Sequence, residues 1–135
     1  MTLSSEDKKT LSQFRLQKAK EFLDDAQKNF DDGRYRTSVN RSYYAALNAA
    51  RALLILEGAN PETHDGVITM LSLRFVKKGI LPSEVIKSFK LLLSRRTDVD
   101  YGDFDSIDKE EALVSLNDAK TFIEAIEQAM KKILL

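Results

Sequence analysis

The segment LLLSRRTDVDYGDF, residues 91–104, combines two adjacent arginines, several carboxylates and a tyrosine. Helical spacing places Arg96 on the same side as Phe89, so a guanidinium continues the stripe that should face the core. Such a guanidinium needs an acidic partner or a ligand. Asp100 lies one helical turn further on, within pairing range, and Tyr101 follows it. The alternative is a helix end whose arginines interact with the helix dipole and whose aspartates face water.

A second polar set lies in a helix predicted for residues 34–57, which is apolar around most of its circumference. Its remaining strip carries polar side chains at intervals of three and four residues: Arg41, Tyr44, Asn48 and Arg51. A helix that is apolar on most sides belongs in the middle of a bundle, where aligned polar groups need a buried partner or a ligand. We therefore predict that this strip, together with Arg95 and His64, contributes to ligand binding.

These residue types suit the binding of an anion or a nucleic-acid backbone, because arginine forms a fork that matches phosphate. Tyrosine donates a proton or stacks on a base, but its high pKa makes it a poor general base at neutral pH. His64 is the only side chain whose unperturbed pKa is near neutrality. At the start of a helix after Thr63 its expected role is structural, unless the fold brings it beside Arg96.

Several classes of enzyme are excluded at the level of motifs. The sequence has no glycine-rich phosphate loop, no nucleophile elbow, no HExxH pair and no EF-hand loop. It has no cysteine and a single histidine, so we expect neither a metal site nor a cofactor.

Length and composition indicate one domain, residues 1–135, with 43% hydrophobic and 31% charged residues. No apolar run approaches a membrane span and the N-terminus lacks an apolar signal segment, which together with the absence of cysteine predicts a cytoplasmic protein. Net charge is zero, but residues 34–96 carry 11 Lys or Arg against 4 Asp or Glu, which leaves +7 there. A surface formed by these residues would attract anions.

The hydrophobic periodicity is helical throughout and predicts an all-α, up-and-down antiparallel bundle of about five helices. We expect helices over residues 4–31, 34–57 and 64–78, a fourth from Pro82 to the break at Gly102, and a fifth from a cap at Asp105 or Ser106 to the C-terminus.

Four segments in this order resemble the HEPN domain proteins, particularly a branch of small proteins: NRSYYAALNAARALLILEG, THDGVI, FVKKGILP and RRTDVDYGDF. The resemblance covers nearly the whole chain. It implies a helical bundle that usually forms dimers. HEPN proteins are often paired with a minimal nucleotidyltransferase as toxin and antitoxin, and many are metal-independent ribonucleases.

In the ribonucleases the motif is an arginine, a polar residue, a few variable positions and a histidine, contributed by both subunits of a dimer. The resemblance implies that Arg96 is the motif arginine and Thr97 the polar residue, with Tyr101 at the histidine position. Counting from Arg95 places Asp100 there instead, so the histidine is missing in either register. Some HEPN toxins are silenced by nucleotide transfer onto a tyrosine just beyond the histidine, and Tyr101 is near that position.

Three hypotheses follow. The first is a homodimeric HEPN protein that associates with nucleotide or RNA and is the partner of a minimal nucleotidyltransferase in a toxin–antitoxin pair. The second is a metal-independent endoribonuclease toxin in which Arg96 acts with Tyr101, Asp100 or His64. The third is a structural dimer without a ligand.

Overall fold

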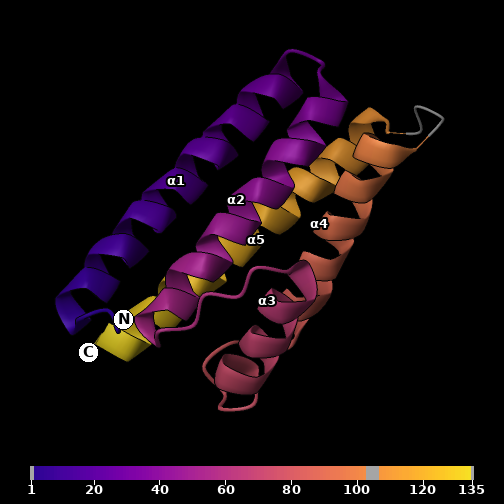
Figure 1. Cartoon of the computed structure of the whole chain (residues 1–135). Coiled ribbons are helices and arrows are strands. Elements are labelled where there is room, and N and C mark those ends of the chain that lie inside the picture. The colour runs from indigo at the N-terminus through magenta and orange to yellow at the C-terminus, as the bar shows by residue number, and fades with distance from the viewer. Residues whose placement is uncertain (1, 103–106, 135) are drawn as a thin grey trace.

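The computed structural model of the protein describes residues 2–102 and 107–134. Helices account for most of this part of the chain (Figure 1), in the order α1 (Ser5–Asp31), α2 (Tyr35–Leu56), α3 (His64–Leu71), η1 (Ser72–Val76), α4 (Glu84–Tyr101) and α5 (Lys109–Leu134). No strand occurs within the described ranges. The predicted all-α helical bundle is therefore confirmed.

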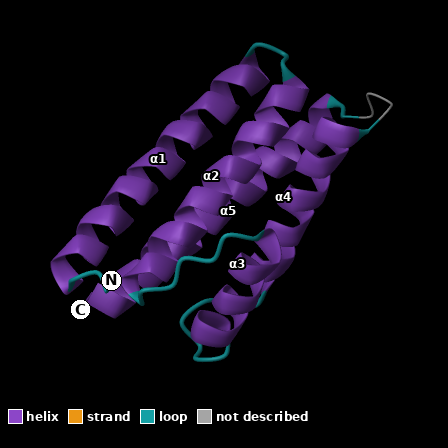
Figure 2. Ribbon diagram, viewed as in Figure 1, coloured by secondary structure: helices purple, strands orange, loops and turns teal. Residues whose placement is uncertain are grey.

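Helix α2 lies at the centre of the bundle and packs against α1, α3, α4 and α5. The four long helices run alongside one another, and the short α3 crosses in front of α4 (Figure 2). The two termini lie at the same end of the bundle (Figure 1). This arrangement explains the composition of α2, since a helix with neighbours on most sides can keep only a narrow polar strip.

The core is built around fully buried side chains of α2 and the aromatic rings that meet them. Tyr43, Phe89 and Phe122 follow one another with ring centroids 5.6 Å apart at each step, which links α2, α4 and α5 through the interior. Alanines of α2 allow α1 to approach closely, and the Ser12 hydroxyl donates a hydrogen bond of 2.6 Å to the Ala52 carbonyl. The relative register of α1 and α2 is thereby fixed.

The helix ends that the structure describes follow the sequence signals with one difference. Ser4 accepts a hydrogen bond from the Asp7 amide and caps α1, as its position predicts. The helix predicted for residues 64–78 is α-helical only as far as Leu71, after which the chain forms the wider π-helical turn η1. The Asp108 carboxylate accepts from the Glu111 amide at the start of α5, whereas the caps predicted at residues 105 and 106 lie outside the described residues.

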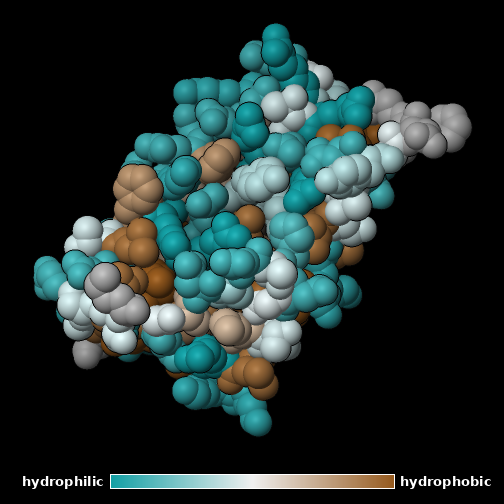
Figure 3. All heavy atoms as spheres, viewed as in Figure 1, coloured by the Kyte–Doolittle hydropathy of each residue, from teal (hydrophilic) through white to brown (hydrophobic). Residues whose placement is uncertain are grey.

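The surface in Figure 3 is hydrophilic over most of its area, with a small hydrophobic group near the end where the termini lie. Across the described ranges, every helix is too short or too polar to cross a membrane.

Candidate functional site

Two adjacent tyrosines on α2 form the base of the site. Tyr43 is fully buried and packs edge-on against Tyr44, with ring centroids 5.3 Å apart. Tyr44 in turn meets Phe22 of α1 at 6.1 Å, and Tyr43 meets Phe89 of α4. Because both rings are held by neighbouring helices, their positions are fixed by the packing of the core.

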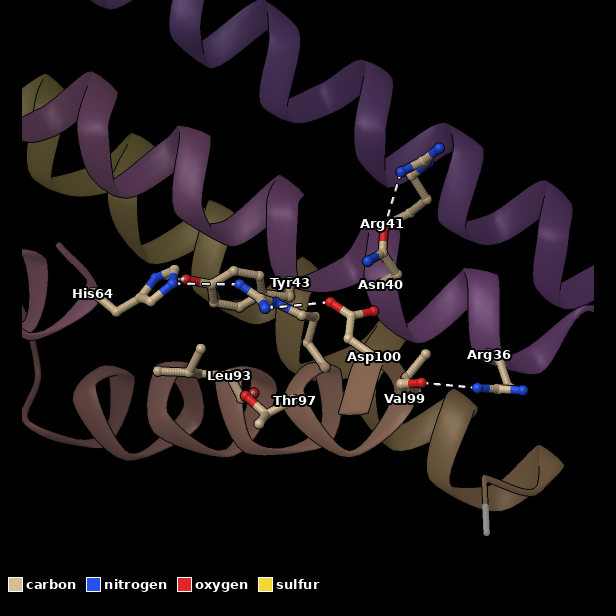
Figure 4. A network of polar contacts seen from close by, with 10 residues as sticks. Arg36, Asn40, Arg41, Tyr43, His64, Leu93, Thr97, Val99 and Asp100 are labelled. Atoms are coloured by element: carbon tan, nitrogen blue, oxygen red, sulfur yellow. Dashed lines mark hydrogen bonds and ion pairs between the residues drawn. The ribbon is translucent and has the colours of Figure 1, made fainter. Parts of the chain in front are cut away.

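Arg96 of α4 lies over both tyrosine rings. Its guanidinium carbon is 5.0 Å from the centroid of Tyr43 and 5.6 Å from that of Tyr44, within the range of cation–π attraction. The residue is only 8% exposed, which confirms that Arg96 continues the inward-facing stripe of α4. Two polar groups contact it: Nη1 donates to Oδ2 of Asp100 at 3.2 Å, and Nη2 lies 3.3 Å from Nε2 of His64 (Figure 4).

His64 reaches this arginine from the first residue of α3. Thr63 caps the helix by accepting from the Gly66 amide at 2.9 Å, which fixes the start of α3 at His64. The other ring nitrogen of His64, Nδ1, is hydrogen-bonded to the hydroxyl of Tyr43. The imidazole is therefore held at both nitrogens, by Tyr43 on one side and Arg96 on the other.

Burial and the neighbouring positive charges favour the neutral form of His64. Burial lowers its pKa from the ordinary value, and the positive charges of Arg96 and Arg51 lower the pKa further. The carboxylate of Asp65 acts in the opposite direction but is the smallest contribution. A neutral imidazole has one nitrogen with a free electron pair, which is the form that accepts a proton.

Tyr43 keeps its proton as well. Burial raises the pKa of its hydroxyl to about 12, although the nearby charge of Arg96 acts against this shift. We call the five residues Tyr43, Tyr44, His64, Arg96 and Asp100 the Arg96 cluster. It combines a fixed guanidinium, a neutral imidazole and a carboxylate in contact with the guanidinium.

An open cavity of about 580 Å³ lies beside Asp100, between the start of α2 and the end of α4. Its lining is mostly polar and basic: Arg36, Thr37, Asn40, Arg41, Val99 and Asp100. Arg36 donates to the Val99 carbonyl at 2.8 Å, which ties the two helix ends together (Figure 4). The carboxylate that contacts Arg96 thus borders an accessible space with two further guanidinium groups.

Comparison with known proteins places this fold in a family. The family model described as HEPN domain matches residues 12–129. The chain belongs to the HEPN family. The sequence resemblance to HEPN proteins is therefore confirmed.

Relatives of similar length support this assignment. A UPF0332 protein of Thermotoga maritima is 30% identical over 125 residues, which cover 93% of this chain and 95% of that protein. The protein named "Putative toxin MJ0605" of Methanocaldococcus jannaschii is 37% identical over 120 residues, or 86% of each chain. The crystal structure of TT1696 from Thermus thermophilus superposes with a TM-score of 0.76 at 18% identity, covering 87% of this chain and 97% of that one, and shows the same fold.

The residues at the HEPN motif positions lie in different surroundings. Thr97 donates its hydroxyl to the Leu93 carbonyl at 2.9 Å, within its own helix. Tyr101 is 76% exposed at the end of α4, outside the Arg96 cluster. The imidazole in contact with Arg96 instead comes from His64 on α3, 32 residues earlier in the chain. From the sequence, His64 was expected to take part in the site only if the fold brought it beside Arg96. The structure places it there.

The other predicted ligand-binding residues divide into two groups. Arg51 is close enough to His64 and Tyr43 for its charge to lower the pKa of each. Asn48 donates to the Tyr44 carbonyl at 2.8 Å, while Arg95 turns toward α5. There Arg95 donates to Asp118 at 2.9 Å and to Ser115 at 3.3 Å, so its contacts join α4 to α5.

Two residues near the site were not predicted from the sequence. Tyr43 lies in the apolar row of its helix, and the available signal was that a buried tyrosine hydroxyl requires a hydrogen-bond partner. No feature of the sequence indicated that Arg36 lies near the site, because its position beside Val99 depends on how α2 and α4 pack together.

Arg41 donates to Asn40 at 2.9 Å and lies 5.8 Å from the Phe22 ring, at the edge of the cavity.

Within residues 2–102 and 107–134, no group of three or more His, Asp or Glu side chains is arranged to hold a metal ion.

Proposed function

We propose that this HEPN protein is the toxin-type member of a toxin–antitoxin pair and that its Arg96 cluster binds the phosphate backbone of RNA. Two relatives from M. jannaschii support the first part, since both are named as toxins. One is MJ0605, and the other, MJ0142, is 29% identical over 108 residues. The second part depends on the site itself.

The observation that carries the proposal is the contact between Arg96 and Asp100. A carboxylate at 3.2 Å from Nη1 marks a place where the oxygen atoms of an anion fit against this guanidinium. The Asp100 side chain is 30% exposed and borders the cavity that contains Arg36 and Arg41. A phosphate entering this cavity can displace the carboxylate and bind Arg96, with positive charge on either side.

The distribution of charge favours the same ligand. Residues 34–96, which supply α2, α3 and most of α4, carry the excess of 11 basic over 4 acidic residues. Lys and Arg groups near a phosphate backbone release its counterions, which makes binding strong at low salt.

RNA binding is tested by fluorescence anisotropy with a labelled single-stranded RNA of about 12 nucleotides at about 50 mM and about 200 mM salt. We expect Arg96→Gln to weaken binding about tenfold at low salt, because one charge-assisted phosphate contact is lost. Lys90→Gln, which removes an exposed charge from the same helix, should change affinity less than twofold. Equal binding by wild type and Arg96→Glu would contradict the proposal and favour a structural role for Arg96.

We also propose that the chain acts in the cytoplasm as a homodimer whose antitoxin is a minimal nucleotidyltransferase. The reason is the HEPN family membership together with the names of the toxin relatives. Light scattering after gel filtration measures the dimer, and co-expression with the neighbouring gene product followed by affinity purification measures the complex. A monomer at micromolar concentration, or a neighbour that fails to co-purify, would contradict the corresponding part.

A second function, endoribonuclease activity, is favoured by the distance of 3.3 Å between His64 Nε2 and Arg96 Nη2. When Arg96 turns to a phosphate, the free electron pair of Nε2 becomes available to a ribose 2′-hydroxyl. The 2′-oxygen then bonds to phosphorus and its proton passes to His64, while the bond to the 5′-oxygen breaks and water protonates that oxygen. The products are a 2′,3′-cyclic phosphate and a 5′-hydroxyl, and Arg96 stabilises the added negative charge.

Cleavage is tested with end-labelled RNA in the presence of EDTA. We expect His64→Gln to retain RNA binding and to lower the cleavage rate by about a hundredfold or more, since general base catalysis contributes at least that much. Intact RNA after prolonged incubation with the wild-type dimer would rule out this second function while leaving RNA binding in place.

A further inference from the structure

Arg15 of α1 and Arg51 of α2 form a pair of like charges on the part of the bundle next to His64. Arg15 Nη1 donates to the Arg51 carbonyl at 3.4 Å, and the hydrogen bond from Ser12 to Ala52 holds the two helices in this register. Both arginine side chains are partly buried. The packing of α1 against α2 thus brings the Arg15 guanidinium to the backbone of Arg51.

This pair has no counter-ion in the part of the chain that the structure describes. In the described part of the chain, no carboxylate forms an ion pair with either guanidinium, and Nε of Arg51 is buried without a hydrogen-bond partner. Burial lowers the pKa of Arg15, and the charge of Arg51 lowers this pKa further. Arginine stays protonated in proteins, so two such groups held together without an acid attract an anion.

The pair is separate from the Arg96 cluster but close to it. Arg51 lies two helical turns beyond Tyr44, whose ring contacts Arg96, and these turns span about 10 Å along α2. The charges of Arg51 and Arg96 both lower the pKa of His64. A stacked strand advances about 3.4 Å per nucleotide, so the separation corresponds to about three stacked nucleotides, or fewer in an extended strand.

We infer that Arg15 and Arg51 form a second phosphate subsite, and that the protein binds a single RNA strand by placing one phosphate there and another at Arg96. The identity of the ligand as RNA rests on the proposed function. The strand would pass His64 between the two phosphates. A ligand with one phosphate can occupy only one of these places, so the arrangement selects a strand over a mononucleotide.

The subsite is tested directly by NMR, through the Nε–H signals of the arginine side chains. Inorganic pyrophosphate and, separately, a single-stranded RNA of about 12 nucleotides are titrated into the full-length protein. We expect both to shift the Arg51 signal, because a phosphate bound at this guanidinium brings negative charge close to its Nε–H. The signal of Arg74, which pairs with Glu57 at 3.7 Å, should remain unchanged.

The contribution to strand binding is measured with Arg15→Gln/Arg51→Gln. We expect this variant to bind the RNA about tenfold more weakly and to lose about 0.7 from the slope of log affinity against log salt, the value for one phosphate contact on a single strand. Its affinity for a mononucleotide at Arg96 should be unchanged. Lys87→Gln/Lys90→Gln removes two exposed charges from α4 and is the matched control, for which we expect less than a twofold effect.

Folding of the double variant is checked by thermal unfolding in buffer without phosphate. Removing two like charges should leave the midpoint unchanged or raise it, so that weaker binding does not result from unfolding.

The outcomes separate this inference from the proposed function. RNA binding that requires Arg96 but leaves the Arg51 signal and the double variant unaffected would overturn the second subsite alone. A pyrophosphate shift at Arg51 in a protein that binds no RNA would overturn RNA as the ligand, and the proposed function with it. A shift with RNA together with the tenfold loss supports the inference.

Discussion

The Nε2 atom of His64 lies 3.3 Å from Nη2 of Arg96. An arginine has only donors, so Nε2 must supply the electron pair of this hydrogen bond. The ring proton of neutral His64 is therefore on Nδ1, where it is donated to the hydroxyl oxygen of Tyr43. One arginine thus sets the tautomer of the histidine, and protonation of the ring would place two cations in contact.

The first prediction concerns pH. The pKa of His64 is lowered in the folded protein, by burial and by the charges of Arg96 and Arg51, while in the unfolded chain it has its ordinary value near 6.5. The unfolded state therefore takes up a proton first as the pH falls. The stability associated with neutral His64 is fully present above pH 6.5 and is lost as the pH falls from there through the folded pKa. Urea unfolding at several pH values between about 7.5 and 5 measures this loss.

The matched control is His64→Gln, in which an amide oxygen can still accept from Arg96 but does not titrate. Because the chain has a single histidine, the difference between the two stability curves isolates this one group from the carboxylates. Parallel curves for wild type and variant would show that the pKa of His64 is not lowered by folding.

The second prediction concerns Tyr43→Phe, which keeps the ring packed against Phe89 but removes the hydroxyl. The Nδ1–H of His64 then lacks its acceptor, so we expect the free energy of unfolding to fall by about 1 kcal/mol. The imidazole is then held only through its contact with Arg96, which should lower RNA cleavage more than RNA binding. Chemical denaturation and the two RNA assays measure these effects, and an unchanged histidine ring signal in NMR would contradict the assigned hydrogen bond.

Contacts within one helix were predictable from the sequence. Arg96 and Asp100 are one turn apart on an amphipathic helix, and the ion pair between them follows from that spacing. The central position of α2 likewise followed from its apolar circumference. In both cases the periodicity of a single segment is enough to predict the structural feature.

Contacts between helices were not predictable in the same way. His64 reaches Arg96 because α3 packs against α2 and α4, and no periodicity relates residues that are 32 positions apart. Arg15 has the pattern of an exposed residue beside the apolar stripe of α1, and only the register of α1 against α2 reveals its neighbour Arg51.

The third prediction is that Asp100→Asn strengthens RNA binding. The carboxylate competes with phosphate for Arg96, so its removal should raise affinity several-fold at low salt. The lost ion pair should lower the free energy of unfolding by only about 0.5 kcal/mol, because the carboxylate is partly exposed. Anisotropy titrations compare this variant with Asp98→Asn, which removes an exposed charge from the same turn. Weaker binding by Asp100→Asn alone would show that Asp100 contributes to the ligand site.

The fourth prediction contrasts the two adjacent arginines of α4. Arg95 bridges to Asp118 and Ser115 of α5, whereas Arg96 faces His64 and Asp100. Arg95→Gln should therefore lower the free energy of unfolding by about 1 kcal/mol and leave RNA binding within twofold of wild type.

Arg96→Gln should lower the unfolding free energy by about 2 kcal/mol, since it leaves partly buried groups unpaired, and should also weaken RNA binding about tenfold. Denaturation and anisotropy measured on both variants separate stability from binding. If Arg95→Gln weakened RNA binding as much as Arg96→Gln, the functional surface would have to include the side of α4 that faces α5.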